Sequence, residues 1–380
     1  MSLDDIPLPP GAAREGGPTT NWSALFHAYG TATDTAEVLA GPLEAAGDHL
    51  WSAILHQGSV WPATPPVLSS VAGRLAEAPL LGLRFVRDVA SSVRFGDGAE
   101  ELRAEVAAAP TREWTAAYVA ADEDEQVDLW SDDDGTGDLV LAAAALDCWD
   151  LLPELVDPVA AFLDDPDERV RTCAWATVTR LLDHPAAAAA HGPHLLPRLT
   201  RAAGAAGSVE ERAALVMDLG DLGGDPAAFL ADPSPLVRCA AATTRPLADD
   251  PAAHAELLAA ARTPTAFDAL SDLPRFGGGP ARWTLVAVLC DRVRDLSRLH
   301  EPALAALPHA FRLAPCPDLG PYLKAHFPTG LPEHPTPEQA SLARELAARD
   351  DLWSPVNGNR RITLAQLGLP VDRETWWAVG

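Results

Sequence analysis

The sequence predicts an all-α protein in which many short helices pack side by side as an α-solenoid. Much of the apolar content is alanine, the best helix former, and the alternating pattern typical of strands is nearly absent. The 35 prolines suit many short helices, with proline in the first turn or just past the end. One string with the form helix, break, helix also occurs twice, which is the signature of a repeat array.

The predicted elements follow one another almost without pause. Residues 1–20 are rich in Pro, Gly and Thr without periodicity, so we expect a disordered tail. The solenoid is predicted over 21–349, in helices of roughly 10–16 residues separated by Pro, Gly or Asp-Pro. Residues 350–380 are turn-rich and contain Trp353, Trp376 and Trp377, so we predict a cap that closes the last apolar face of the array.

The repeated string reads AAFLDDPDERVR at 160–171 and AAFLADPSPLVR at 227–238, an offset of 67 residues (238 minus 171). Phe-Leu ends one helix, and Asp-Pro breaks it because proline disfavours helix in the residue before it. Asp167 and Ser234 then occupy N-cap positions of the next helix. The predicted unit is helix, tight turn, helix.

The second helix of each copy opens with Val and Arg. We predict that Val170 and Val237 point into the core. Arg171 and Arg238 are long enough to reach back across the turn to nearby carbonyl or carboxylate oxygens. Arg212 occupies a similar position in the segment between the two copies, where the match is weaker.

The pattern D-P-x-x-x-V-R-x-x-A at 165–174 and 232–241 resembles the HEAT repeat in its short bacterial form. The resemblance implies a HEAT-like, ARM-type right-handed α-α superhelix, with its clearest repeats at 150–250. In that family, Asp and Arg form hydrogen-bonded ladders between repeats. It therefore implies a structural ladder role for Asp165, Arg171, Asp232 and Arg238.

A second resemblance lies in the N-terminal third. NWSALFHAYG at 21–30 and WSAILHQGSVWPAT at 51–64 are similar to the opening of a group of actinobacterial HEAT-repeat proteins. It implies fold and lineage, and no activity. Arginine supplies the basic residues almost alone, Lys324 being the one lysine, and this composition suggests a GC-rich bacterial genome.

The charge is one-sided, with a formal net charge of −26. Such a surface repels phosphate backbones and anionic membranes, which argues against duplex nucleic acid and membrane partners. It favours a basic protein or peptide, although solubility alone would also account for it. No apolar run approaches the roughly 20 residues of a membrane span, and the acidic, proline-rich start does not read as a signal peptide.

Five cysteines, odd in number and never spaced C-x-x-C, argue against a disulfide framework or a cysteine zinc site. Buried thiols in a reducing cytoplasm fit better. The densest acidic stretch, 122–138, fails as a calcium loop, because Trp130 and Leu141 would take the first and last ligand positions. We interpret it as a solvated loop, with a docking surface for a basic partner as the alternative.

Histidines and tryptophans are the remaining site candidates. His49 and His56 are seven residues apart and would share one helix face, but no third ligand follows, so we predict no metal site and no cofactor. His191 and His194 are a weaker pair. Trp149 and Trp175, among alanines, should be core. The best candidate binding residues surround the His-Gln-Gly turn: Trp51, His56, Gln57 and Trp61.

No nucleophile elbow, P-loop or dinucleotide-binding motif occurs. The sequence therefore favours a non-catalytic scaffold or adaptor. Two alternatives stay open. One is an enzyme on a HEAT-like frame, of the DNA glycosylase or bilin lyase kind, although the negative charge opposes the former. The other is an acidic immunity or inhibitor protein that neutralises a basic toxin.

Overall fold

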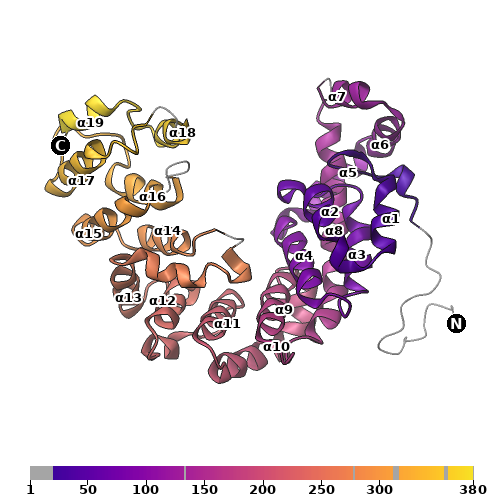
Figure 1. The fold of residues 1–380 in the computed structure, drawn as a ribbon, viewed down its shortest axis with the longest axis horizontal. Coiled ribbons are helices and arrows are strands. Elements are labelled where there is room, and N and C mark those ends of the chain that lie inside the picture. Colours follow the sequence, from indigo (N-terminus) through magenta and orange to yellow (C-terminus); the bar gives the residue numbers. More distant parts are fainter. Residues whose placement is uncertain (1–19, 132–133, 277–278, 311–315, 355–357, 380) are drawn as a thin grey trace. The chain divides into compact units, whose positions relative to one another are not determined.

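The computed structural model describes residues 20–131, 134–276, 279–310, 316–354 and 358–379, so the tail predicted at 1–20 lies outside them except for Thr20. Helices form nearly all of the regular structure (Figure 1). Two strands of two residues each, β1 (Phe26–His27) and β2 (Gly30–Thr31), pair antiparallel as the one sheet of the described residues. The all-α prediction is confirmed.

The chain divides into two compact units, residues 1–194 and 195–380. The sequence did not predict this boundary, which falls inside helix α10 (Pro185–Ala205). The first unit contains nine α-helices among its described residues before α10: α1 (Thr35–Ala40), α2 (Gly47–His49), α3 (Thr64–Ala72), α4 (Pro79–Ser92), α5 (Ala99–Ala108), α6 (Thr111–Ala120), α7 (Glu123–Ser131), α8 (Thr136–Ala160) and α9 (Glu168–Leu181). Short 3-10 and π turns join them: η1 (Trp22–Ala24), η2 (Ala32–Asp34), η3 (Leu43–Ala46), η4 (Leu50–Ile54), η5 (His56–Gly58) and η6 (Gly96–Gly98).

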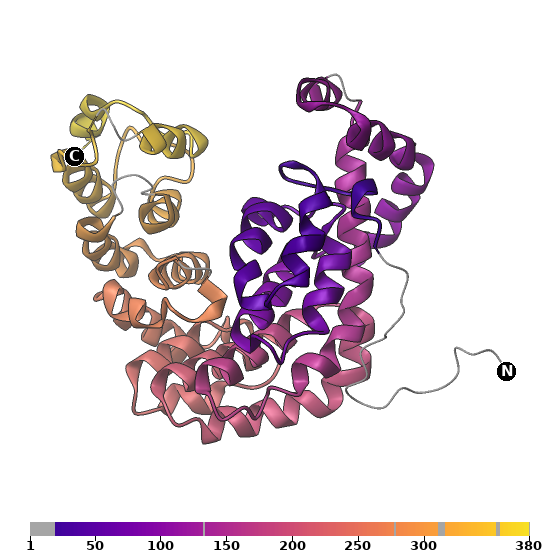
Figure 2. The same cartoon turned by 45° about the vertical axis from the view of Figure 1, so that its right-hand side comes forward.

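Helix α8 organises the first unit. It packs against α3, α4, α5, α6 and α9, and Figure 2 shows it running through the unit as a long rod. Its 25 residues include Pro153 and Pro158, so the expectation that prolines limit helices to short segments is wrong here. Each proline removes one backbone hydrogen bond. Burial of Leu152, Val156 and Val159 along one face keeps the helix continuous across that loss.

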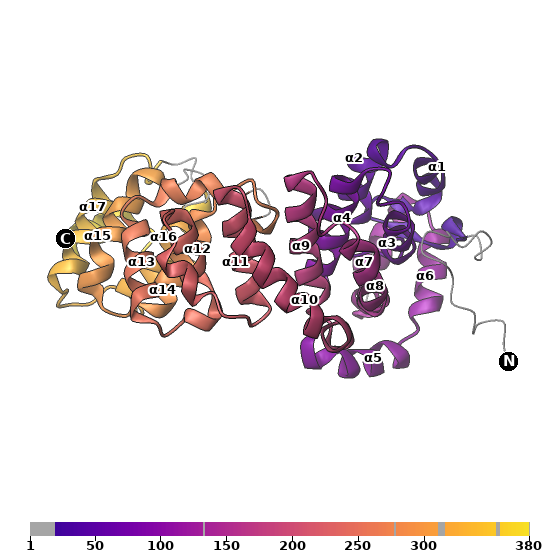
Figure 3. The ribbon, with the colours of Figure 1, turned by 90° about the horizontal axis from the view of Figure 1, so that it is seen from below.

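The second unit is a succession of packed helices. Its α-helices are α11 (Val209–Asp221), α12 (Pro235–Thr243), α13 (Pro251–Ala261), α14 (Arg282–Arg292), α15 (Leu296–Ala306), α16 (Cys316–His326), α17 (Pro337–Ala348), α18 (Gly358–Gln366) and α19 (Arg373–Val379). The 3-10 segments are η7 (Ala227–Ala231), η8 (Arg245–Leu247), η9 (Pro264–Leu270), η10 (Pro274–Phe276) and η11 (Leu307–His309). Figure 3 shows α11 to α17 following one another along the unit, and α11–α12, α12–α13 and α13–α14 pack as neighbours.

The two copies of the repeated string differ in their first element. In the first copy, α8 ends at Ala160 and Asp167 caps α9, its carboxylate accepting from the backbone N–H of Arg169. In the second copy, η7 is a five-residue 3-10 helix, so the predicted helix, turn, helix unit is wrong there. Ser234 precedes α12 but makes no side-chain cap bond.

The predictions for Val and Arg are confirmed. Val170 and Val237 are buried, with 8% and 0% of their surface exposed. Arg171 Nη1 donates to the carbonyl of Asp165 at 2.6 Å, and Arg238 Nη1 to that of Asp232 at 3.0 Å. Arg212 Nη2 donates to the carbonyl of Ala206 at 2.8 Å. Three arginines thus make the same clamp to a carbonyl six residues earlier.

Asp232 also connects neighbouring elements. One carboxylate oxygen accepts from the backbone N–H of Ser234 at 2.8 Å. The other accepts from Arg212 of α11 at 3.1 Å, which ties α11 to the turn before α12. Asp165 repeats the first bond by accepting from the backbone N–H of Asp167 at 2.8 Å.

Two tryptophans were predicted to lie in the core, and that prediction is confirmed. Trp149 and Trp175 are buried. In the predicted cap, Trp376 is buried and closes a small cavity of about 30 Å³ together with Leu364 of α18, whereas Trp377 is 48% exposed. Cys148, Cys173, Cys239 and Cys290 are free and buried, as expected. Among the described residues, no helix combines the length and the apolar character that a bilayer span needs.

Candidate functional site

The predicted binding residues do not gather into one aromatic surface. Trp51 lies on η4 and faces α4, where its indole N–H donates to Asp88 at 3.0 Å and its ring meets Phe85 edge-on. Trp61 instead packs on Phe26, with 6.1 Å between ring centroids. The two tryptophans therefore belong to different packing clusters.

His56 and Gln57 form an exposed turn beside Tyr29. His56 Nδ1 lies 2.8 Å from the carbonyl of Ser52, so this nitrogen carries the proton. The Tyr29 hydroxyl lies 3.4 Å from the same nitrogen, and the Tyr29 ring, 67% exposed, stands edge-on to the imidazole. Gln57 has φ of 52°, the one non-glycine residue in the described chain with left-handed backbone. Such strain concentrates at functional turns.

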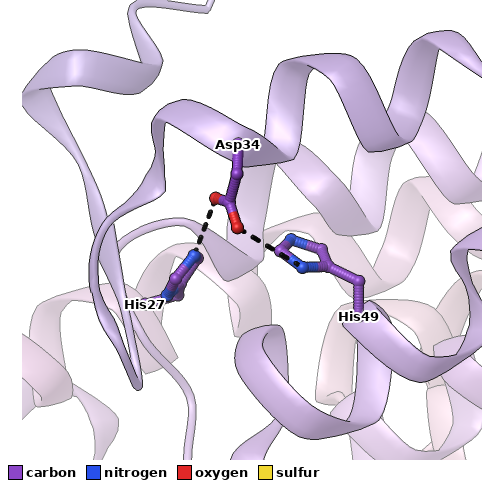
Figure 4. A group of neighbouring side chains, drawn as sticks. All are labelled: His27, Asp34 and His49. Carbon is purple, nitrogen blue, oxygen red and sulfur yellow. Dashed lines mark hydrogen bonds and ion pairs between the residues drawn. The ribbon is translucent and has the colours of Figure 1, made fainter.

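A histidine and aspartate cluster lies behind this turn, and the sequence did not predict it. His27 is on β1, Asp34 ends η2, and His49 ends α2 (Figure 4). His27 Nε2 and Asp34 Oδ1 are 2.9 Å apart, and His49 Nδ1 and Asp34 Oδ2 are 3.9 Å apart. The rings of His27 and His49 meet edge-on at 5.4 Å.

The cluster has two buried rings and one open carboxylate. The side chains of His27 and His49 are 4% and 13% exposed, against 59% for Asp34. Partial burial acts to raise the pKa of Asp34. The hydrogen bond and charge of His27, with the charge of His49, outweigh this effect and lower the pKa. Burial also lowers the pKa of His49, although Asp34 opposes that shift, so His49 is neutral at neutral pH.

The hydrogen bonds fix where the His27 proton sits. His27 Nδ1 accepts from the backbone N–H of Tyr29 at 3.2 Å, so the proton of the neutral ring is on Nε2 and points at Asp34. His49 Nε2 lies 3.0 Å from the hydroxyl of Thr35, which leaves Nδ1 toward Asp34. These three residues offer metal-ligand atoms within 4.8 Å of one another.

The prediction that His49 and His56 share one helix face is wrong. The helix ends between them: Leu55 has non-helical backbone, and His56 starts the separate turn η5. His49 meets His27 and Asp34 instead. His191 and His194 share α10 with their rings 5.7 Å apart, and His191 lies 3.6 Å from Asp157.

The acidic stretch 122–138 contains helix α7, so the predicted loop is wrong, although the acidic residues of this helix are exposed to solvent as predicted. The backbone N–H of Glu125 donates to Asp122, and that of Asp122 donates to Glu125, at 3.0 and 3.2 Å. This reciprocal capping box starts the helix, and acidic residues in the first turn complement its dipole. The string D-x-x-E at 122–125 was the signal that could have predicted it. Asp132 and Asp133 lie outside the described residues.

Helices α6, α7 and the start of α8 surround an acidic hollow of about 520 Å³. Its lining combines carboxylates with apolar side chains, and none of the described residues in it is basic. The carboxylates are Glu113, Glu125, Asp128 and Asp134, and the apolar residues are Pro110, Trp114 and Leu129. Hydrogen bonds from the side chain and backbone of Thr136 lower the pKa of Asp134, which keeps it ionised.

An aromatic cluster supports the hollow. Trp114 stacks on Tyr118 with 5.3 Å between centroids and meets Trp130 edge-on at 4.9 Å. Gly137 allows this contact, because a Cβ there would lie 2.4 Å from the Trp130 ring. The same cluster continues to Phe26 and so to β1.

A second depression, the alanine-lined groove, shares Glu113 with the hollow. Its volume is about 940 Å³, and it runs between η1, α5, α6 and α8. Alanine and valine side chains form half of its wall, with Arg112 and Asp147 among the polar residues. Burial, with the charge of Asp150, raises the pKa of Asp147.

The chain has no match among family models, curated proteins or solved structures.

Proposed function

We propose that the protein is a non-catalytic binding protein. It takes up a basic segment of another protein in the acidic hollow and the adjoining alanine-lined groove. The hollow carries this proposal, because four carboxylates surround it without a basic counterpart in the described lining. Trp114 and Leu129 add apolar contact beneath the charges. This combination suits an arginine side chain, with a charged head and an apolar stem.

The two depressions share Glu113, which lets one segment occupy both. Small alanine side chains in the groove allow close approach of a helical or extended backbone, and the hollow supplies the charge. The net charge of −26 supports capture of a basic partner, because opposite potentials steer encounter.

We further propose that the fold is a HEAT-like solenoid, a right-handed α-α superhelix. The clamp made by Arg171, Arg212 and Arg238 supports it, because the same hydrogen bond recurs at each repeat-like turn. The proposed setting is a reducing cytoplasm, which the free and buried state of the four described cysteine side chains supports. Burial raises their pKa, so these thiols are not candidate nucleophiles.

The test is fluorescence anisotropy with a labelled synthetic peptide of alternating arginine and alanine. The alternating glutamate and alanine peptide and random duplex DNA are the comparison ligands. We expect the basic peptide to bind with an affinity that falls as salt rises, and neither comparison ligand to bind. Duplex DNA that binds at micromolar concentration with steep salt dependence would overturn the proposal and favour the enzyme alternative.

A charge-matched pair of variants locates the site on α7. Glu125→Gln with Asp128→Asn removes two charges from the hollow, and glutamine at 125 preserves the capping box. Glu123→Gln with Asp124→Asn removes the same charge from exposed positions of α7 that do not line the hollow. Two exposed ion pairs contribute up to about 1 kcal/mol each, so we expect roughly tenfold weaker binding for the first variant only. Equal loss in both would mean that charge alone, and not the hollow, binds the peptide.

A further inference from the structure

We propose that His27, Asp34 and His49 form a binding site for a divalent transition-metal ion of the zinc class. Two imidazoles and one carboxylate are a ligand set that such ions favour, with a remaining position for water. The three candidate ligand atoms lie within 4.8 Å of one another. Ligand atoms of a tetrahedral zinc ion lie roughly 3.4 Å apart, given bonds of about 2.1 Å, so the cluster needs a modest contraction.

Asp34 can supply part of that contraction by closing its 3.9 Å distance to His49, and a small shift of the rings must supply the rest. The two imidazole rings are buried, whereas the Asp34 side chain is 59% exposed. Figure 4 shows its carboxylate between the two rings, with one oxygen toward each. The ion would enter from the solvent side, beside Asp34.

His49 already has the arrangement of a metal ligand. A ligating histidine donates its other N–H to a neighbouring acceptor. His49 Nε2 lies 3.0 Å from the hydroxyl oxygen of Thr35, which is buried and can accept that N–H. The lone pair of Nδ1 then faces Asp34.

His27 must change its tautomer. Its proton is on Nε2, the atom that would bind the metal, and Nδ1 accepts from the N–H of Tyr29 at 3.2 Å. When the ion binds Nε2, the ring keeps one proton, which moves through solvent to Nδ1. Two N–H groups then face each other, so the Tyr29 hydrogen bond breaks and the turn between β1 and β2 shifts. Metal binding is therefore coupled to the position of Tyr29 beside His56.

The experiment is titration of the full, tag-free chain with Zn²⁺, and with Co²⁺ as a spectroscopic probe. We expect one ion per chain at micromolar affinity or tighter. Asp34→Asn and His49→Gln should each weaken binding by at least about 10- to 100-fold, the loss that removal of a residue hydrogen-bonded to a ligand already causes. His191→Gln is the matched control, because His191 pairs with His194 and Asp157 elsewhere and should leave binding unchanged.

Fluorotyrosine labelling gives a second readout that does not depend on affinity. The chain has three tyrosines, so fluorine NMR gives three signals. Zn²⁺ should move the signal of Tyr29, while that of Tyr322, which lies in the second unit, stays fixed. Absence of binding at millimolar Zn²⁺ would overturn the proposal. So would binding that survives Asp34→Asn and His49→Gln together, or binding that leaves the Tyr29 signal unmoved.

Discussion

Arg292 at the end of α14 holds the C-terminal end of α12. Its guanidinium donates to the carbonyls of Ala242, Thr243 and Thr244 at 2.5, 2.8 and 2.8 Å. The last carbonyls of a helix have no partner within the helix, so this side chain supplies the bonds that α12 lacks. Burial lowers the pKa of Arg292, as expected for a guanidinium drawn partly out of water.

We predict that Arg292→Met destabilises the second unit by about 3 kcal/mol. Each hydrogen bond from a charged donor contributes about 1.5–3 kcal/mol. The energies of three bonds from one group are not additive, and removing the guanidinium also removes its desolvation cost. The expected loss of stability is therefore far below three times the energy of one such bond. Arg294→Met should cost less than about 0.5 kcal/mol, because Arg294 is 75% exposed and makes a surface ion pair with Asp291.

Amide hydrogen exchange followed by mass spectrometry measures the loss of stability in α12 of the Arg292→Met variant. A loss of about 3 kcal/mol speeds exchange in α12 about a hundredfold where exchange follows local opening. Peptides from α4 and α9 in the first unit serve as the internal reference. Unchanged exchange in α12, or an equal effect from Arg294→Met, would refute the reasoning.

Three further predictions concern the core. Val170→Asp should destabilise the fold by about 3–5 kcal/mol, because it buries an unpaired charge, and the melting temperature should fall. Arg169→Asp, at the exposed neighbouring position, should destabilise it far less. Burial raises the pKa of Cys173 to about 11 and that of Cys290 to about 12. In a Cys316→Ser variant, the thiols of the folded protein should therefore resist a thiol reagent at pH 8 and react only after unfolding. Burial lowers the pKa of His326, so the unfolded chain binds the extra proton first. Stability should therefore fall as the pH drops below about 6.5, and the urea midpoint of His326→Phe should depend less on pH between 7.5 and 5.5.

The sequence predicted those features of the fold that depend only on residues close to one another in the chain. The burial of Val170 and Val237 and the reach of Arg171 and Arg238 follow from helix-start geometry within about two turns. The capping box that begins at Asp122 is an equally local signal, and it starts α7 where a loop was predicted. The prolines of α8 do not end that helix, because burial along one face outweighs the backbone hydrogen bonds that they remove.

The candidate sites were harder to predict because they depend on contacts between distant segments. His27 and His49 are joined by a hairpin of two-residue strands and by the short elements η2, α1 and η3, none of which has a strong pattern. The acidic composition of 122–138 did suggest a docking surface. The hollow itself needs Trp114 and Glu113 from α6, whose packing against α8 no local rule predicts.

The central position of α8 has a consequence for synthesis of the chain. Helices α3, α4, α5 and α6 all come before α8, and each packs against it. While the ribosome has produced only the first 135 residues, α3 and α4 can pack against each other, but the apolar faces that these helices turn toward α8 are uncovered. At about 5–20 residues per second, the 25 residues of α8 take roughly one to five seconds to make. For that interval the nascent chain presents uncovered apolar surface. Chaperones would act on this stretch of translation, and a chain that stops before Thr136 should aggregate rather than fold.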